Sequence, residues 1–579
     1  MRMQYERTRR IAIVGGGPSG LFLFKTLIEN ALPGWSIDIF ESKDQLGAGM
    51  PYSIEGATRE HVTNVSGNEI PKLVTSLKEW ITNLSVEMTE QFQMQPYEFS
   101  DYHVLPRLLF GKYLADQFNL LLQKAGSSGV TTAVHLNTTV IDIRDMPEMN
   151  AVKIETGTNE LFEFDKVILC TGHSWPPAYE GLVAGYFDSP YPPSKLKLHF
   201  DHPVAIRGSS LTAIDAVRTL ARNHGEFKEE GPHQLSFIAN DSAGDFRIVM
   251  HSRQGLLPAI RFHLDDPHLS KYRLLTKEDI EAHMSTNNGF LSLDFIFEKD
   301  FKEGIRDKDP GFYDRIKDMN MESFVDSMMS LREKVDPFVF LKREYEEAKQ
   351  SIRNQESVYW KEMLAVLSFA MNYPAKHFAA EDMLRLQKVL MPLISIVIAF
   401  VPQRSCEEII ALHHSGRLEL VPVGDDSHVE IIPEGGIAYH YTNEAGILQT
   451  TTYQTYVDCA GQPHLPAKDF PFKSLLRDGT VSEARLKFLS AQTGKSLMNE
   501  NKETIIADTD SDIYLKVPGI AITDSFRAVD KNGKSNPRLF IMAVPYIGGY
   551  NPDYSGLDFC EEASRLIVRD ITGQWADGS

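Results

Sequence analysis

A short apolar run that leads directly into three glycines constrains this chain more than any other feature. The stretch RIAIVGGGPSGLFLFKTLIE runs from Arg10 to Glu29. Glycine loses more conformational freedom on folding than any other residue, so consecutive glycines need a structural reason. One reason is a tight strand-to-helix turn, which brings backbone N–H groups at a helix N-terminus close to a phosphate. The alternative is a glycine-rich loop without a ligand.

The three glycines belong to a G-x-G-x-x-G pattern in its expected context. A second strand pattern, WSIDIFES, follows the helical stretch and reaches an acidic residue, which completes a βαβ unit. In such a unit the first glycine makes the turn, the second admits a pyrophosphate, the third allows close helix–strand packing, and the acid accepts a hydrogen bond from a ribose hydroxyl. The predicted contact residues are Gly15, Gly17, Pro18, Ser19, Gly20 and Glu41.

A second βαβ pattern begins with PVAIRGSSLTAIDAVRTLARN. Serine replaces the central glycine here, so the pattern is weaker than the first. The next strand pattern, RIVMHSR, ends in Arg253, and a cation at that position suits a 2′-phosphate, which favours NADPH over NADH. The alternative is that Arg253 extends over the surface without a ligand. The predicted contact residues are Gly208, Ser209, Ser210, Thr212 and Arg253.

Composition excludes several classes of protein. The formal net charge is −20 and no lysine- or arginine-rich tract occurs, so we expect no nucleic-acid surface. The four cysteines form no C-x-x-C pair, and HLDDPHL (263–269) lacks a recognisable ligand spacing, so we expect no metal site and a reduced, cytoplasmic protein. The longest apolar run, residues 393–401, is less than half of a membrane span, so we expect no membrane partner.

The order of these patterns predicts an α/β fold with two Rossmann-like dinucleotide-binding domains, for FAD and NADPH, and a mostly helical insert. The length of 579 residues is consistent with several domain-sized units. Charged, helical patterns replace the strand patterns in the middle of the chain. The predicted segments are 1–190 (FAD domain, first part), 191–261 (NADPH domain, first part), 262–400 (helical insert and substrate region), 401–440 (NADPH domain, return) and 441–579 (FAD domain, C-terminal part).

Several motifs together give the chain a resemblance to a known group of proteins. They are IAIVGGGPSGL, GAGMPYS followed by EHVTNVS, HVLPRLLFGKYL, VILCTGH, GSSLTAIDAVRTLA, HSRQGLLP and YVDCAGQP. With these the chain resembles the flavoproteins that have two dinucleotide-binding domains. More closely, it resembles the group related to N-hydroxylating flavin monooxygenases, including an aspartate N-monooxygenase type. The motifs cover most of the chain outside the helical insert.

The resemblance implies further site residues. GAGMPYS and HVTNV correspond to segments around the isoalloxazine, with Asn64 as the catalytic residue at its reactive edge. VILCTGH and VDCAGQP correspond to the two crossings between the domains. The strand end LFIMAVPYIGGYN lacks the acid that many flavoproteins have there, so backbone groups would contact the ribityl chain instead. The implied contacts are Met50, Tyr52, Asn64, Arg107 (flavin phosphates or ribityl chain), Val140 (adenine), Thr171, Gly172, Gly461, Gly548 and Gly549.

The same resemblance implies an activity. It is that of an NADPH-dependent FAD monooxygenase, which uses molecular oxygen at flavin C4a to hydroxylate a nitrogen of a small amine or amino-acid-like substrate. Two alternatives remain open from the sequence. One is a flavin reductase or dehydrogenase of the same fold, and the other is a flavin-binding scaffold whose insert recruits a protein. The sequence also leaves open whether the chain forms a homo-oligomer.

Overall fold

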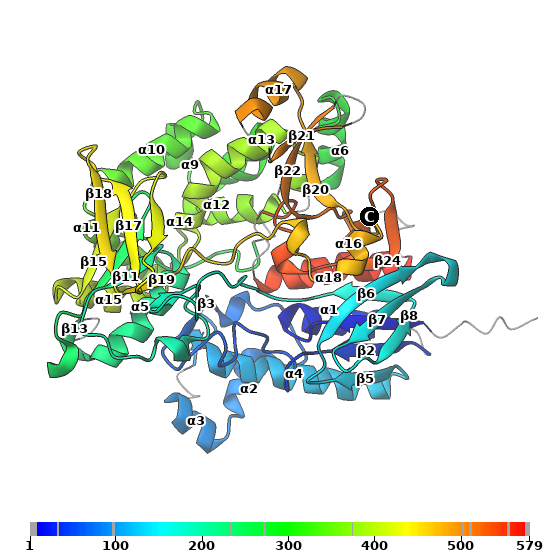
Figure 1. Ribbon diagram of the computed structural model, residues 1–579, viewed down its shortest axis with the longest axis horizontal. Coiled ribbons are helices and arrows are strands. Elements are labelled where there is room, and N and C mark those ends of the chain that lie inside the picture. The colour runs from blue at the N-terminus through cyan, green and yellow to red at the C-terminus, as the bar shows by residue number, and fades with distance from the viewer. Residues whose placement is uncertain are drawn as a thin grey trace, which may run out of the picture.

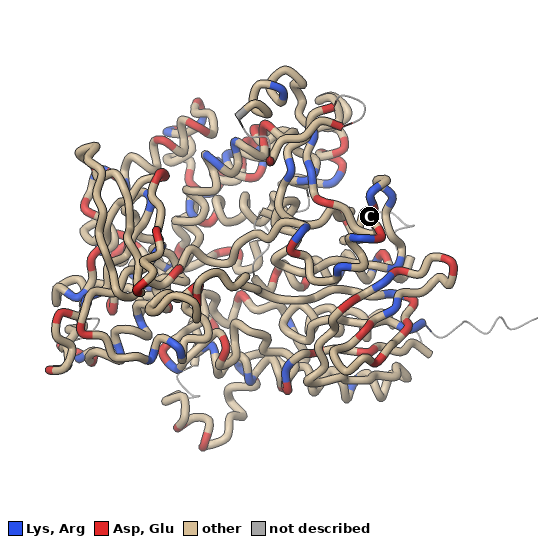
Figure 2. The backbone as a smooth tube through the Cα atoms, viewed as in Figure 1, with Lys and Arg blue, Asp and Glu red and all other residues tan. Residues whose placement is uncertain are grey.

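The computed structural model describes residues 9–31, 34–94, 99–231, 234–269, 274–372, 374–500, 503–508, 512–552 and 556–573. Figure 1 shows two sheet regions, one at the lower right and one at the left, with helices of the middle of the chain along the top. Figure 2 shows basic and acidic residues interspersed over these regions.

The first sheet is built around the N-terminal strand. Its spatial order is β23 (Arg527–Val529), β24 (Ser535–Ile541), β9 (Lys166–Leu169), β1 (Arg10–Val14), β2 (Ser36–Phe40) and β5 (Thr131–His135). All neighbours are parallel except β23, which runs antiparallel to β24. β1 is buried from Ile11 to Val14, so the predicted buried strand is confirmed. The carboxyl ends of β24, β9, β1 and β2 therefore meet at one edge of the sheet.

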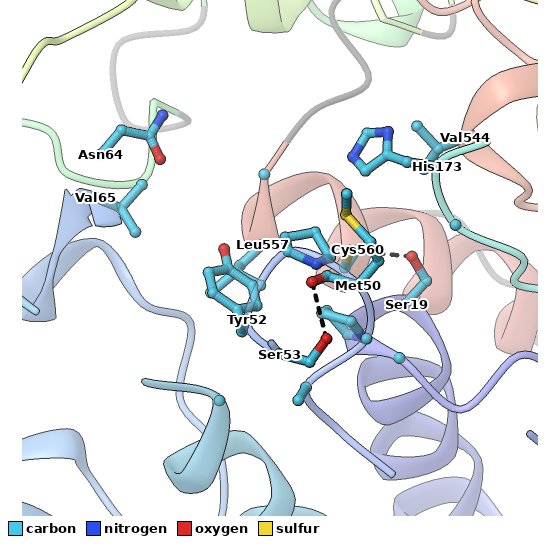
Figure 3. A pocket seen from close by; sticks show the side chains of 18 of the residues that line it. Ser19, Met50, Tyr52, Ser53, Asn64, Val65, His173, Val544, Leu557 and Cys560 are labelled. Carbon is cyan, nitrogen blue, oxygen red and sulfur yellow. Dashed lines mark hydrogen bonds between the residues drawn. The ribbon is translucent and has the colours of Figure 1, made fainter. Parts of the chain in front are cut away.

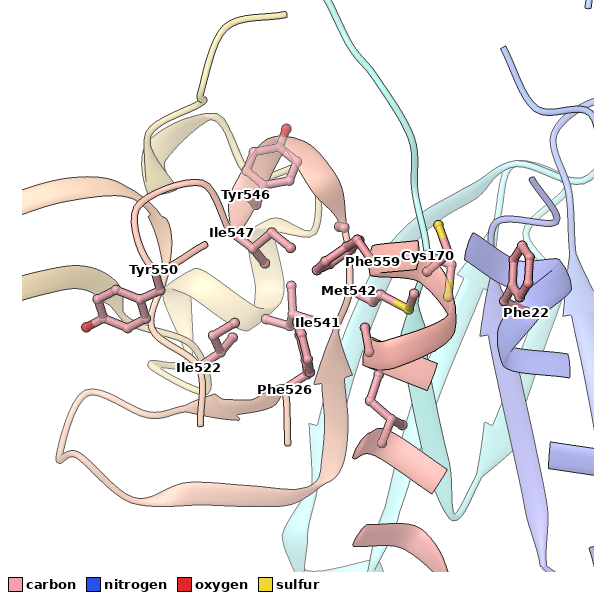
Figure 4. Close-up of a cluster of buried hydrophobic side chains, with 14 of the residues drawn as sticks. Phe22, Cys170, Ile522, Phe526, Ile541, Met542, Tyr546, Ile547, Tyr550 and Phe559 are labelled. Atoms are coloured by element: carbon pink, nitrogen blue, oxygen red, sulfur yellow. The ribbon is translucent and has the colours of Figure 1, made fainter. Parts of the chain in front are cut away.

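Helices cover this sheet through a shared core. α1 (Pro18–Asn30) packs against α18 (Leu557–Thr572) and against α4 (Arg107–Ser127), where the rings of Phe24 and Phe118 stack with centroids 5.4 Å apart. Figure 4 shows Met542, just after β24, beside Phe559 of α18 and Cys170, which follows β9. The two ends of the chain therefore complete one hydrophobic core.

The second sheet is entirely parallel. Its order is β10 (Tyr186–Phe187), β19 (Thr455–Asp458), β11 (Val204–Arg207), β14 (Ile248–Ser252) and β15 (Leu418–Pro422). α5 (Leu211–His224) follows β11, so the second βαβ unit has the predicted form. Because β19 pairs with β11, the chain leaves this sheet only after Asp458. Our predicted boundary between 440 and 441 therefore lies too early, because only the pairing with a distant strand shows to which sheet β19 belongs.

The middle of the chain is helical, as its charged periodic patterns predicted. Its longest helices are α10 (Met321–Glu333), α11 (Pro337–Asn354) and α12 (Tyr359–Ala370). The apolar run 393–401 contains the end of α14 (Met391–Val397), which is buried in the core, so it is a helix end. In the part of the chain that the structure describes, we find no helix with the length and hydropathy needed to span a membrane.

Candidate functional site

A cavity of about 1040 Å³ opens at the carboxyl edge of the first sheet. Residues that follow four of its strands line this cavity: Gly15 after β1, Glu41 after β2, Cys170 after β9 and Val544 after β24. Ligands of open α/β sheets bind outside the carboxyl ends of the strands, and the volume is at the upper end of the range of about 300–1,000 Å³ for ligand sites. The fold therefore places the cavity where a dinucleotide is expected.

The glycine motif has little room for side chains. Gly15 has φ +108°, and a Cβ there would lie 2.6 Å from the carbonyl oxygen of Cys170. A Cβ on Gly20 would lie 2.2 Å from the carbonyl oxygen of Gly15. Gly17 precedes α1 and lines the cavity, where its missing side chain leaves the helix N-terminus bare. The turn, the helix packing and the open N-terminus are thus three separate consequences of three glycines.

Glu41 lies beside this turn and fixes its shape. Its Oε2 accepts a hydrogen bond of 2.8 Å from the backbone N–H of Gly16, and its Oε1 accepts one of 3.0 Å from the backbone N–H of Lys43. A carboxylate has about four acceptor positions, so capacity remains for a ribose hydroxyl. Pro18 and Ser19, in the first turn of α1, also line the cavity, and Ser19 Oγ lies 3.4 Å from Cys560 Sγ.

The segment that contains Met50 and Tyr52 forms a second side of the cavity (Figure 3). It approaches the helices closely, because a Cβ on Gly49 would lie 2.8 Å from Pro18 Cδ. Ser53 Oγ donates a 3.1 Å hydrogen bond to the Met50 carbonyl oxygen. Burial raises the pKa of Tyr52 to about 12, so its hydroxyl stays protonated at neutral pH. Tyr52 therefore contributes an uncharged hydroxyl to this side of the cavity.

Asn64 lines the cavity from β3 (Val62–Ser66). Its backbone carbonyl oxygen accepts a hydrogen bond from the guanidinium of Arg261, which is buried. The same guanidinium donates to Ser66 Oγ at 2.9 Å and forms an ion pair with Glu69. The strand position of Asn64 is thus fixed through its backbone, and Figure 3 shows its side chain at the cavity next to Val65.

The two crossings between the sheets lie side by side. Gly172 lines the cavity after β9, with Thr171 preceding it, and the backbone N–H of Ser174 donates a 2.9 Å hydrogen bond to Gln462 Oε1 on the other crossing. His173 also lines the cavity, and burial lowers its pKa, which keeps it neutral near pH 7. Gly461, at the second crossing, has φ +95°. Both crossings therefore connect the cavity to the second sheet.

The second dinucleotide motif repeats the geometry of the first. Gly208 has φ +108°, and a Cβ there would lie 2.7 Å from the carbonyl oxygen of Cys459. Ser209 Oγ donates a 2.7 Å hydrogen bond to the Leu256 carbonyl oxygen, while Ser210 is the N-cap of α5 and Thr212 lies in its first turn. Arg253 follows β14 with a side chain that is 70% exposed, 3.7 Å from Asp425.

Several predicted contact residues do not line the cavity. Arg107 Nη1 donates a 2.5 Å hydrogen bond to Asp215 of α5, and its Nε donates to the Val62 carbonyl oxygen, so it joins the two domains. Val140 begins β6 (Val140–Met146), which pairs with another strand. Gly548 and Gly549 are packed against His464 and Pro518.

Sequence reasoning missed a second group of lining residues. Leu557, Asp558 and Cys560 line the cavity from the start of α18, whereas the contacts predicted for this part of the chain lie just after the preceding strand, at Gly548 and Gly549. The middle of the chain, which we predicted as the substrate region, adds an apolar surface. Its sequence did not indicate which residues line the cavity, because the contact forms only on folding. Its lining residues are Leu264, Pro267, Leu269, Ala365, Phe369, Ile398 and Phe400.

Comparison with known proteins defines the class to which this fold and site belong. Residues 12–174 match the family model described as FAD-NAD(P)-binding, so the N-terminal part of the chain is an FAD/NAD(P)-binding domain of an oxidoreductase fold. Residues 276–398 match the family model of the YdhS-like middle domain. The predicted class of fold and the predicted FAD and nicotinamide cofactors are confirmed at this level.

Individual proteins that resemble this chain have low sequence identity to it. The chain is 28% identical over 473 residues to the uncharacterized protein YdhS of Escherichia coli (strain K12), a match that covers 81% of this chain and 86% of YdhS. It is similar to ornithine hydroxylase PvdA from Pseudomonas aeruginosa, with a TM-score of 0.47 and 12% identity over 98% of this chain and 99% of that one. Ornithine N-hydroxylase KtzI from Kutzneria sp. 744 gives a TM-score of 0.43 and 14% identity, over 98% and 99%.

The cavity residues fit FAD. A glycine cradle that a Cβ would fill, a bare helix N-terminus and a carboxylate at the end of β2 are the groups that a pyrophosphate and a ribose require. Gly15, Gly17 and Ser19 would hold the pyrophosphate and Glu41 the ribose. Met50, Tyr52, Asn64, Gly172 and His173, which line the cavity beyond the glycine turn, would surround the ring system.

Proposed function

We propose that this protein is an NADPH-dependent FAD monooxygenase that hydroxylates a nitrogen of a small amine or amino-acid-like substrate. The observation that carries the proposal is the composition of the cavity. Glycines and polar groups form a cradle for a dinucleotide, and the lining residues from the middle of the chain are all apolar. A reductase that passes electrons to a soluble acceptor needs an open flavin, whereas oxygen transfer needs a site that excludes water.

Different residues of this chain would have different roles in the proposed reaction. Bound FAD supplies the oxygen-activating chemistry, after reduction by a nicotinamide coenzyme. The apolar residues of the middle segment would exclude water from the part of the cavity where the flavin reacts. Asn64, whose strand is anchored by Arg261, would donate from a neutral amide without bringing in a titratable proton. Gly208, Ser210, Thr212, Gly461 and Arg253 would form the coenzyme site on the second domain.

Stoichiometry tests this proposal. Purified FAD-loaded protein should consume NADPH and oxygen in step with hydroxylated product, with little hydrogen peroxide, when substrate is present. Rapid reduction of an artificial acceptor without reaction with oxygen would favour the reductase. A flavin that NADPH never reduces would favour the scaffold.

Asn64→Ala should uncouple this reaction. The substitution keeps the backbone carbonyl that accepts from Arg261, and the glycine cradle lies elsewhere, so FAD should remain bound and its reduction should change little. Without the amide at the cavity, reduced FAD should yield more hydrogen peroxide and less product. Stopped-flow absorbance and a peroxide assay measure both quantities. A fully coupled Asn64→Ala enzyme would remove the proposed role.

Arg253→Ala should affect NADPH more than NADH. Charge-assisted hydrogen bonds contribute about 1.5–3 kcal/mol. Because the Arg253 side chain is exposed, we expect its bond to the 2′-phosphate to lie at the lower end of that range. Its loss should raise the KM for NADPH roughly tenfold. Arg247→Ala is the matched control, because Arg247 immediately precedes β14 at the opposite end of the strand. Steady-state kinetics with both coenzymes measure the effect. Equal changes for NADPH and NADH would show that Arg253 does not contact the 2′-phosphate.

A further inference from the structure

Part of the cavity lining is an apolar surface that comes from one part of the chain. All its lining residues between positions 262 and 400 in the described ranges are apolar. They come from two loops and from α12, so three separate segments contribute to this surface. The residues that we use below are Leu264, Leu269, Ala365, Phe369, Ile398 and Phe400, which we call the apolar wall.

The loop that carries Leu264 and Leu269 is fastened at two points. At one end, the buried carboxylate of Glu362 on α12 accepts hydrogen bonds from the backbone N–H groups of Asp265, at 3.3 Å, and Asp266, at 2.6 Å. At the other end, His268 Nδ1 lies 3.2 Å from Asp558 Oδ1 at the start of α18. The wall is therefore held in place next to a carboxylate.

Asp558 is an acidic residue that lines the cavity beside this wall. Its side chain is 23% exposed and that of His268 is 44% exposed, so the pair extends from the cavity to solvent. The charged groups near Asp558 are His268 from the loop, the acids Glu561 and Asp266, and Lys25, which pairs with Glu561. With Asp558 included, the acids outnumber the cations. Burial raises the pKa of Asp558, while the contact with His268 opposes that rise. The position of Asp558 in the first turn of α18 offsets the positive end of the helix dipole.

We propose that the substrate is an apolar amine, whose ammonium group binds to Asp558 and whose hydrocarbon body lies against the apolar wall. This inference rests on the proposed function and narrows its substrate class. The acidic surroundings favour a cation over the carboxylate of an amino acid. Nitrogen must lose a proton before it can react as a nucleophile. That proton would pass from the ammonium group to the Asp558 carboxylate and, through His268, to solvent.

Binding to the oxidised, FAD-loaded protein tests the inference without turnover. The probes are 2-phenylethylamine, its uncharged counterpart 2-phenylethanol, and L-ornithine, each titrated while the flavin absorbance spectrum is recorded. The amine should bind about tenfold more tightly than the alcohol, because a charged group strengthens a hydrogen bond to a carboxylate. L-Ornithine should bind more weakly than 2-phenylethylamine, since its second ammonium and its carboxylate would face the wall.

Two variants and one control sharpen the test. Asp558→Asn should reduce amine affinity about tenfold and leave alcohol affinity unchanged, and it should abolish the pH dependence of amine binding. Ala365→Leu should weaken 2-phenylethylamine but not methylamine, because it fills space at the wall. Glu562→Gln is the control, since Glu562 lies on the same helix, forms an ion pair with Arg565 and does not line the cavity.

The outcomes separate this inference from the proposed function. Equal affinity for amine and alcohol, or an Asp558→Asn protein that still prefers the amine, would overturn the inference. If amines bind through Asp558 but are never hydroxylated, the amine site stands and the monooxygenase assignment fails. If hydroxylation occurs without a preference for the charged probe, the monooxygenase assignment stands and the proposed amine site fails.

Discussion

Gly17→Val is expected to yield a folded protein that purifies without flavin. Valine would place side-chain atoms at the bare N-terminus of α1, where the backbone must come close to the pyrophosphate. A Cβ at this position already lies 3.3 Å from Gly49 Cα, so the side chain cannot turn away without moving the segment that carries Met50. FAD affinity should fall at least tenfold, since a loss of about 1.4 kcal/mol is sufficient for that.

The ratio of flavin to protein absorbance measures this effect, and circular dichroism reports the fold. Gly126→Val is the matched control, because Gly126 lies on α4 with open space around it and the φ of an ordinary helical residue. Normal flavin content in Gly17→Val would show that the pyrophosphate lies elsewhere.

The first half of the site could be predicted because its signals are local in sequence. The strand, the glycine turn, the helix and Glu41 follow one another within 32 residues, from Arg10 to Glu41, and each glycine has its own steric requirement. The second motif was predictable for the same reason. The similar contacts of Gly15 with Cys170 and of Gly208 with Cys459 show that both turns solve one packing problem.

The other half depends on contacts between distant segments. Asp558 lies at the cavity because α18 packs on α1, and nothing near Asp558 in the sequence indicates this. The apolar wall likewise has the composition of an ordinary core. For Arg107 the sequence predicted a contact that the structure does not place at the cavity. Its partner Asp215 lies 108 positions away, and without knowledge of that partner an arginine near a flavin motif suggests a phosphate contact.

The contact between Arg107 and Asp215 is a largely buried ion pair between the two domains. Asp215 Oδ2 accepts hydrogen bonds from Arg107 Nη1, at 2.5 Å, and from the Tyr191 hydroxyl, at 2.8 Å. His61 Nε2 lies 3.1 Å from the Asp215 carbonyl oxygen. Burial alone would raise the pKa of Asp215, but Arg107, His61 and the Tyr191 hydrogen bond outweigh it and hold the pKa below its ordinary value.

Asp215→Asn is expected to destabilise the protein by about 3–5 kcal/mol, because it leaves the Arg107 charge buried without a counter-charge. A carboxyl group with a lowered folded-state pKa stabilises the fold above its unfolded pKa of about 3.9 and loses that contribution as the pH falls through the folded value. The difference in the free energy of unfolding between wild type and Asp215→Asn should therefore have its full value at pH 7 and become smaller below about pH 4. Denaturant unfolding of the FAD-loaded protein at several pH values measures it.

Two comparisons distinguish the loss of this ion pair from a general effect of removing a charge on stability. Glu281→Ala removes the exposed partner of Lys277, and surface pairs of this kind contribute about 0–1 kcal/mol, so it should change stability little. The double variant Arg107→Met with Asp215→Leu should recover most of the stability lost in Asp215→Asn, because no unpaired charge remains buried. If the double variant is as unstable as the single one, the loss comes from packing, and the ion pair does not account for the contact between the domains.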